Sequence, residues 1–352
     1  MWWIGVDAHK RVHQAAALGE GGGATEQTVP NTPAGWAALY AWAAAWPERA
    51  WAVEGAGSFG RGLAQFLAER GEAVHEVNPR WTAQRRRSAR RPGKSDRLDA
   101  LAVARLLREE AATLPVVPPE DPAAATAQLW SRLRDDLVAD MTRLRNRLHA
   151  LLLLCDPQYP RYVPRLTTQK GLAACLAYTA PGDGPLARAR ERAVRQVAAQ
   201  LALLVDQERE LRAALEALVA ARFAPLQDIE GVGALTAAGL VAELGPPRPG
   251  LGEAQVAAMA GVAPLEASTA GGVRHRLNRG GNRRLNRLLH VIALIQARVY
   301  PPAQAYLARR QQAGRTAREA RRALKRHLIR RVWHQWQACW RHPPEAALPL
   351  AA

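Results

Sequence analysis

Residues 2–7 read WWIGVD and residues 51–54 read WAVE, so two short apolar runs each end in an acid. Short apolar runs bounded by polar residues are typical of buried strands. Carboxylates that follow such strands stand where α/β sheets usually place their functional sites, at the strands' carboxyl ends. Either acid alone could be an ordinary surface residue, so the rest of the sequence must support a site.

The pattern around these runs predicts a mixed α/β domain over residues 1–114. Short strands joined by tight turns suggest a meander, and helical periodicity then alternates with further strands. We expect strands at Trp2–Val6, Val12–Leu18, after the glycines at 21–23, at Trp51–Val53 and at Ala73–Val77, and helices at Pro33–Trp46, Ser58–Arg70 and Ser95–Glu110.

A second segment, residues 115–222, begins with four prolines between Pro115 and Pro122. Proline removes backbone donors, so this stretch reads as a linker. Apolar residues then recur at steps of three and four over 133–151 and again over 194–218, as in a coiled-coil seam. The two helices could pair within the chain, connected by residues 157–185, or the second could form a dimer; both alternatives stay open.

The third segment, residues 223–352, begins with Ile229-Glu230-Gly231-Val232-Gly233 and a helical pattern at Ala234–Leu244. This resembles a helix-hairpin-helix turn, whose glycines let backbone amides approach a phosphate. In the tail, three tryptophans at helical spacing are expected to pack on neighbouring helices rather than stack on bases: Trp333, Trp336 and Trp340.

The charge balance favours a polyanionic partner. The 352 residues include 49 Lys and Arg against 31 Asp and Glu, a formal charge of +18, which suits nucleic acid. No acid occurs between Ala267 and Arg318, although a solvated basic face is the ordinary meaning of such a run. The three cysteines form no CxxC pair, and residues 1–18 carry charges where a signal peptide needs an apolar core, so we expect a cytoplasmic protein without membrane spans.

Two further acids, Asp96 and Asp99, stand three residues apart at the start of a predicted helix and therefore share one face. Aspartate is also favoured in a first turn for structural reasons, with Ser95 as a possible N-cap. Four carboxylates drawn together repel unless a divalent cation neutralises them, and oxygen-only ligands select Mg²⁺ or Mn²⁺. Two such ions can support phosphoryl transfer. His9, beside Asp7, is a candidate base, whereas His290 is expected in a helical core.

These residues resemble the DEDD transposases of bridge-RNA-guided insertion sequences, a family that includes the Piv-type DNA invertases. The matching stretches are IGVDAHK at 4–10, Val53-Glu54, KSDRLDA at 94–100, Gly231-Val232-Gly233, AGVAP at 260–264, Ser268-Thr269 and RGGNRRL at 279–285. The resemblance implies a RuvC-like, RNase H-fold N-terminal domain, a long helical coiled-coil segment and a mainly α-helical C-terminal transposase domain.

The resemblance also implies a mechanism. Asp7, Glu54, Asp96 and Asp99 would hold Mg²⁺, and Ser268 would attack the DNA phosphate and form a covalent phosphoserine, with Thr269 as the alternative nucleophile. Ala270 stands where the family commonly has glycine, so the serine loop here lacks the conformational freedom of a glycine at that position. Six arginines would contact nucleic acid: Arg274, Arg276, Arg279, Arg283, Arg284 and Arg287.

The implied partners are DNA at the element ends and target, a bridge RNA as guide, and further copies of the chain in a dimer or tetramer. In such an assembly the serine of one protomer could meet the metal site of another. Two alternatives remain: a metal-dependent RuvC-like nuclease or junction resolvase in which water attacks, and a nucleic-acid binding protein without catalysis.

Overall fold

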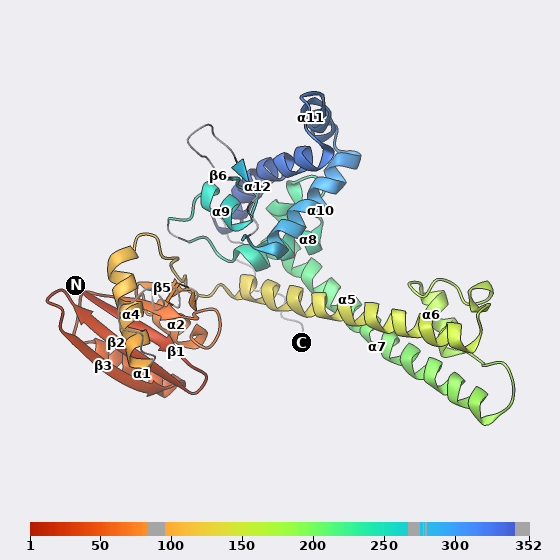
Figure 1. Cartoon of the computed structure of the whole chain (residues 1–352), viewed down its shortest axis with the longest axis horizontal. Helices are drawn as coiled ribbons and strands as arrows, with labels where there is room; N and C mark the ends of the chain where they lie inside the picture. Colours follow the sequence, from red (N-terminus) through yellow and green to blue (C-terminus); the bar gives the residue numbers. More distant parts are fainter. Residues whose placement is uncertain are drawn as a thin grey trace. The chain divides into compact units, whose positions relative to one another are not determined.

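The computed structural model describes residues 1–79, 81–82, 96–248, 250–266, 275–276, 278 and 280–341. The chain divides into two compact units, residues 1–121 with 246–251 and residues 122–245 with 252–352. The first is built on a mixed sheet, and the described part of the second is helical apart from one short two-stranded ribbon (Figure 1). No helix in the described parts of the chain is long and apolar enough to cross a membrane.

Five strands form the sheet of the first unit in the order β3-β2-β1-β4-β5. Antiparallel pairs join β1 to β2 and β2 to β3, which confirms the expected meander, whereas β1 pairs with β4 and β4 with β5 in parallel. The strands are β1 (Trp2–Ala8), β2 (Val12–Gly19), β3 (Ala24–Pro30), β4 (Arg49–Glu54) and β5 (Val74–Val77). In this register Asp7 lies directly beside Glu54.

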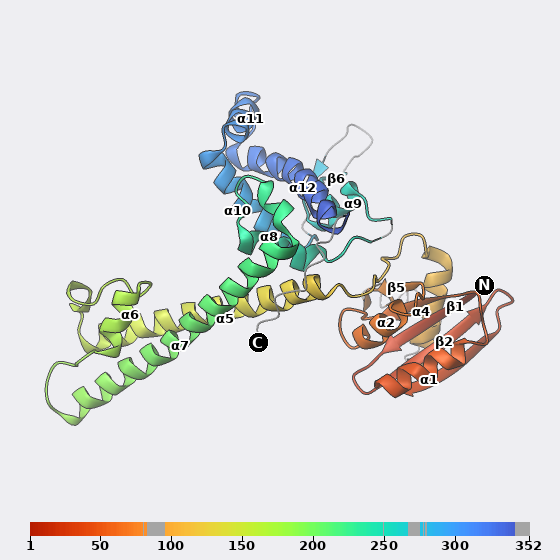
Figure 2. The ribbon, with the colours of Figure 1, turned by 180° about the vertical axis from the view of Figure 1, so that it is seen from behind.

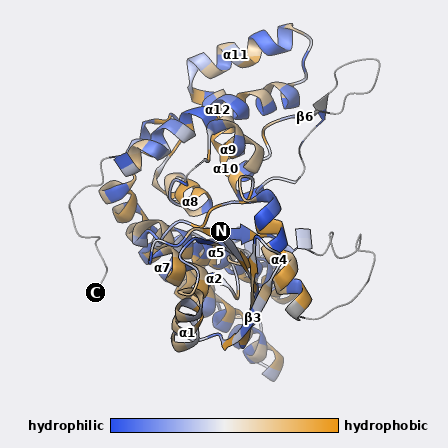
Figure 3. Cartoon of the chain, turned by 90° about the vertical axis from the view of Figure 1, so that its left-hand side faces the viewer, coloured by the Kyte–Doolittle hydropathy of each residue, from blue (hydrophilic) through white to orange (hydrophobic). Residues whose placement is uncertain are grey.

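Helices cover both faces of the sheet. On one face α1 (Pro33–Ala43) and α2 (Arg61–Ala68) pack over Ile4 and Val6. On the other, α4 (Asp96–Glu110) packs over Ala50, Ala52 and Trp3. Figure 3 shows α1 and α4 on opposite sides of the sheet. Because side chains alternate between faces along a strand, Asp7 and Glu54 share the α4 face with Trp3, Ala50 and Ala52.

The helix α4 lies against the backbone of β1 at Gly5. A Cβ atom on Gly5 would stand 2.2 Å from the Ala104 nitrogen and 2.3 Å from the Ala100 oxygen. Trp3, earlier in β1, packs on the cluster that contains Leu107, later in α4. The helix therefore runs back toward the amino end of β1, which directs its first turn toward the strand's carboxyl end, where Asp7 stands.

Part of the proline-rich segment belongs to the sheet rather than to a free linker. The Glu76 N–H donates to the Pro115 carbonyl at 2.8 Å, and the Val117 N–H donates to the Val74 carbonyl at 2.8 Å. Val117 retains the donor that its proline neighbours lack, so this short stretch can pair with the edge strand. The chain leaves the sheet only afterwards, and Pro122 begins the next helix.

Two long helices form a hairpin in the second unit. α5 (Pro122–Cys155) and α7 (Pro185–Arg222) lie side by side in both views (Figures 1 and 2). The pairing therefore occurs within the chain. Glu208, which interrupts the apolar seam, is buried and accepts a 2.7 Å hydrogen bond from Nε of Arg134 on α5. The connection carries two short helices that the pattern did not predict, η1 (Tyr159–Arg161) and α6 (Gln169–Leu176).

The remaining helices pack around one end of this hairpin. α8 has the bounds expected from the sequence, Ala234–Leu244, and Gly231 before it adopts φ +86°. Trp333 and Trp336 are buried, which confirms their packing role. The other elements are η2 (Ala224–Asp228), α9 (Glu253–Met259), β6 (Leu265–Glu266), β7 (His275–Arg276), α10 (Arg283–Val299), α11 (Pro301–Gln312) and α12 (Ala317–Arg341).

We expect Gly5→Ala to destabilise the protein by about 1–3 kcal/mol, because the new methyl group meets backbone atoms of α4 that cannot rotate away. Gly21→Ala is the matched control, since a Cβ there meets nothing within 4 Å. Its effect should stay within about 0.5 kcal/mol. Thermal unfolding followed by circular dichroism measures both, and equal melting temperatures would show that α4 does not approach β1 as described.

Candidate functional site

Two acids of the predicted quartet lie side by side at the carboxyl ends of β1 and β4. Asp7 is 8% exposed, and its Oδ2 lies 3.2 Å from Nε2 of His9. Glu54 accepts a 3.0 Å hydrogen bond at Oε1 from the hydroxyl of Thr82, which is itself buried. Neighbouring strands lie about 4.8 Å apart, so the two carboxylates can approach one ion.

The other two acids belong to the first turn of α4. Asp99 is 8% exposed and shares the buried side of the helix with Val103 and Leu106. Asp96 begins the helix, but its side chain lies outside the described residues. Since α4 runs back along β1, its first turn is directed toward the carboxyl ends of the strands that carry Asp7 and Glu54.

The donor chemistry of these acids fits a hard cation. Carboxylate oxygens on adjacent strands are ligands that Mg²⁺ and Mn²⁺ prefer. Within the described ranges, however, no three His, Cys, Asp or Glu side chains are gathered closely enough to hold a metal ion. The side chain of Asp96 lies outside those ranges. The complete quartet therefore stays a prediction.

The predicted serine site lies in the second unit, and its nucleophile falls outside the described residues, as do Thr269, Arg274 and Arg279. Ser268 stands in the sequence between β6 and β7, which pair antiparallel with Leu265 opposite Arg276. Two predicted nucleic-acid contacts face acids of their own unit. Arg287 lies 3.1 Å from Asp135, and Arg284 lies 3.9 Å from Glu243.

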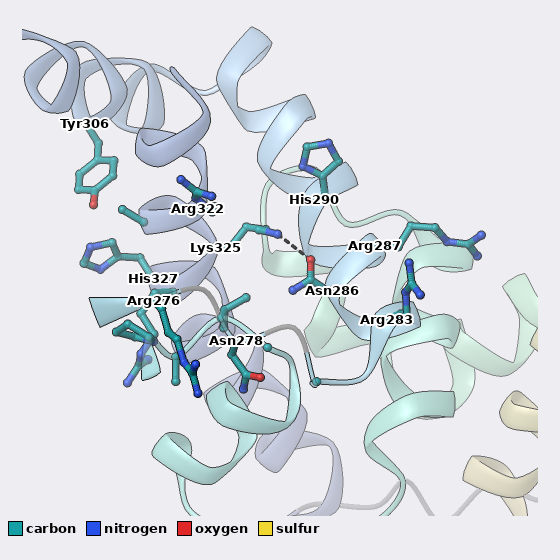
Figure 4. Close-up of a pocket in the computed structure, with 17 residues that line it drawn as sticks. Arg276, Asn278, Arg283, Asn286, Arg287, His290, Tyr306, Arg322, Lys325 and His327 are labelled. Atoms are coloured by element: carbon teal, nitrogen blue, oxygen red, sulfur yellow. Dashed lines mark hydrogen bonds between the residues drawn. The ribbon is translucent and has the colours of Figure 1, made fainter. Parts of the chain in front are cut away.

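A basic pocket of about 970 Å³ lies beside β7 (Figure 4). Its floor is formed by two loops that meet at glycines. Gly261 adopts φ +66°, and a Cβ on Gly281 would stand 2.4 Å from the Gly261 nitrogen, so neither loop could approach the other with a larger residue at position 281. Arg276 and Arg283, both predicted nucleic-acid contacts, line this pocket and are exposed.

The sequence interpretation missed two residues of the pocket wall. His290 was expected in a helical core, but it is exposed and lines the pocket, so that prediction was wrong. Its partial desolvation, followed by the charges of Lys325 and Arg321, lowers its pKa. Lys325 is buried on α12. The sequence did contain a signal for Lys325, because this lysine interrupts the apolar stripe that contains Leu328, Ile329 and Val332.

Both halves of the chain match known families. Residues 4–157 match the model for the DEDD transposase of the IS110 type, and residues 224–308 match the one described as transposase, IS116/IS110/IS902 family. The chain is 28% identical over 295 residues to the insertion element IS110 uncharacterized 43.6 kDa protein of Streptomyces coelicolor, which covers 70% of this chain and 72% of that one.

A second relative and one solved structure are also similar. The insertion element IS116 uncharacterized 44.8 kDa protein of Streptomyces clavuligerus is 32% identical over 160 residues, 45% of this chain and 40% of that one. The structure of T. thermophilus RuvC in complex with Holliday junction substrate is 16% identical, with a TM-score of 0.26 over 33% of this chain and 100% of that chain.

The start of α10 gives a test of how this site is built. Asn282 caps the helix, accepting hydrogen bonds of 3.0 Å from the Arg284 and Leu285 N–H groups, and donates to Glu243 at 2.7 Å. Asn282→Ala should cost about 1–2 kcal/mol in thermal unfolding. Asn282→Ser keeps a capping oxygen and should recover part of that loss. If Ser and Ala are equally destabilising, the cap does not hold this helix.

Proposed function

Because the chain belongs to the IS110 family of DEDD transposases, we propose that it cuts and rejoins DNA strands through a serine nucleophile assisted by a divalent-metal site. The broad activity, DNA transposition, follows from the family. The serine, the metal and the guide RNA are the proposed parts. The observation that carries the proposal is the register of β1 and β4, which puts Asp7 beside Glu54 beneath a helix with an acidic first turn.

In the proposed metal site, Asp7, Glu54, Asp96 and Asp99 hold Mg²⁺, with Mn²⁺ as a substitute. When bound, the metal would neutralise phosphate charge and favour the ionised form of an attacking or leaving oxygen. The protein itself contributes by fixing the positions of these carboxylates. Two acids come from rigid strands and two from a helix held against Gly5, so the first turn of α4 cannot slide away from the sheet without breaking that contact.

The proposed nucleophile is Ser268. Its oxygen attacks the phosphorus, the strand's P–O bond breaks, and the serine proton is lost while the departing oxygen takes up a proton. The hydroxyl of the incoming strand then attacks the phosphorus of the phosphoserine, and the bond from phosphorus to the serine oxygen breaks. The DNA is rejoined without an external energy source, because the phosphoserine keeps the free energy of the broken phosphodiester bond. A hydroxyl needs a positive field to react in this way. The basic pocket beside β7, the strand that follows Ser268 in the sequence, supports such a field through Arg276, Arg283 and Lys325.

We also propose that a bridge RNA selects the DNA and that the chain acts as a homo-oligomer. Recognition through base pairing would leave the protein to bind backbone and shape. Self-association is supported by leucines that remain on the surface of the α5–α7 hairpin. Leu129 is 66% exposed, Leu133 48% and Leu203 59%, and a second copy of the chain would cover this apolar surface.

The serine is tested by trapping. Purified protein incubated with labelled element-end DNA, its RNA and Mg²⁺ should form a covalent protein–DNA adduct visible on denaturing gels. Ser268→Ala should abolish the adduct, whereas Thr269→Val should retain it. Cleavage that persists in Ser268→Ala without an adduct would indicate attack by water and a metal-dependent nuclease. Omission of the RNA should prevent adduct formation on the element ends.

The metal site is tested by charge removal. Asp7→Asn should lower the cleavage rate about a hundredfold or more, because one oxygen ligand loses its charge. The same variant should bind DNA at least as tightly as the parent, since a negative charge is gone. Glu48→Gln is the control, because Glu48 is an acid of the same unit whose side chain is 85% exposed. Unchanged cleavage by Asp7→Asn would exclude this carboxylate from the reaction.

A further inference from the structure

The basic pocket receives side chains from a helix that lies beyond the matched family regions. The family match in this half of the chain ends at residue 308, whereas α12 begins at Ala317. From α12, Arg322 and Lys325 lie opposite residues of α10 in the pocket (Figure 4), and Arg326 also lines it. Among the residues that the structure describes, those that line the pocket include no carboxylate. A smaller pocket of about 370 Å³ shares Arg322 and Lys325 and adds Arg318 and Arg321.

Lys325 has an unusual environment for a lysine. The residue is 9% exposed, and its Nζ donates to Oδ1 of Asn286 at 2.7 Å. The orientation of Asn286 is fixed in turn, because its Nδ2 donates to the Ala260 carbonyl at 2.7 Å. An amide oxygen accepts one of the ammonium's three protons and supplies no negative charge. Asn286 therefore holds the lysine head in the pocket wall without neutralising it.

Some cations of the pocket pair with a carboxylate, and others do not. Arg326 pairs with Glu253, and Arg287 pairs with Asp135. In the parts of the chain that the structure describes, neither Lys325 nor Arg322 pairs with a carboxylate within 4 Å, and the charge of Arg322 acts at longer range on Glu319, one turn earlier on α12. A buried ammonium without a counter-ion is costly, and burial, then the charge of Arg322, lowers the pKa of Lys325. An anion in the pocket would relieve this cost.

We propose that the pocket binds a backbone phosphate of DNA, with Lys325 and Arg322 as its contacts and Asn286 as the residue that positions Lys325. A phosphodiester suits the site because its one negative charge and two acceptor oxygens can bind both the ammonium of Lys325 and the planar guanidinium of Arg322. The neighbouring cations Arg318 and Arg321 extend the same field along the strand. The inference rests on the proposed function only for the choice of DNA over RNA.

The first experiment measures binding without catalysis. The full chain is titrated in EDTA against a short fluorescent element-end DNA duplex at a series of salt concentrations. Lys325→Met should weaken binding about tenfold and reduce the slope of log affinity against log salt by about 0.9, the loss of one phosphate contact. Arg331→Met, on the same helix but outside both pockets, should keep the parent slope. Because no strand is cut, a failure of the serine mechanism would leave this result intact.

Thermal unfolding separates a phosphate contact from a structural tether. Without DNA, Lys325→Met should melt at or above the parent temperature, because an uncompensated buried charge is replaced by an apolar side chain of similar length. A lower melting temperature with an unchanged salt slope would overturn the proposal. Arg322→Gln provides the second variant if Lys325→Met does not fold. Arg322 is exposed, so its replacement should spare the fold and still reduce the slope.

The second experiment identifies the contacted group. Single neutral methylphosphonates are placed along the element-end duplex, one phosphate at a time. At one position the parent should lose affinity while Lys325→Met loses nothing further, which is the signature of direct coupling. The absence of any such position would overturn the proposal. So would a slope change that occurs with an RNA hairpin of equal length but not with DNA.

Discussion

The close contact between Gly5 and α4 is the constraint on which the proposed acidic site depends. Only a residue without Cβ lets the backbone of Ala100 and Ala104 lie on β1, because a methyl group there would overlap both. That contact fixes the depth and direction of the helix. Strand alternation then puts Asp7 and Glu54 on the helix-covered face, and the buried side of α4 directs Asp99 toward the same face. One glycine thus sets the frame for side chains from three separate segments.

Much of the fold could be predicted because its signals are local. The apolar runs that end at Asp7 and Glu54 became neighbouring strands, and the glycine turn before Ala234 fixed the start of α8. The features that escaped prediction depend on tertiary pairing. Residues 115–117 join the sheet only because β5 leaves an edge open to them, and α6 is too short and too lightly periodic to show in the sequence.

The candidate site residues show the same difference between local signals and tertiary packing. Parallel strands carry their carboxyl ends to one edge, so the adjacency of Asp7 and Glu54 followed from the pattern. Lys325 and His290 did not follow, because their role depends on how α12 packs against α10. The sequence did contain one sign of this packing, because Lys325 stands within an otherwise apolar stripe. Burying a charged side chain in a core lowers the stability of the fold. A lysine at such a position is therefore a reason to look for an anion that it binds.

The stereochemical course at phosphorus shows whether a protein side chain carries the DNA strand between cutting and rejoining. Element-end DNA with a single chiral phosphorothioate at the cleaved position is recombined, and the configuration of the joined product is determined. Attack by Ser268 followed by attack of the incoming hydroxyl makes two inversions, so the joined product should show net retention of configuration. Net inversion would mean that one strand attacks the other directly, and it would contradict the covalent serine mechanism.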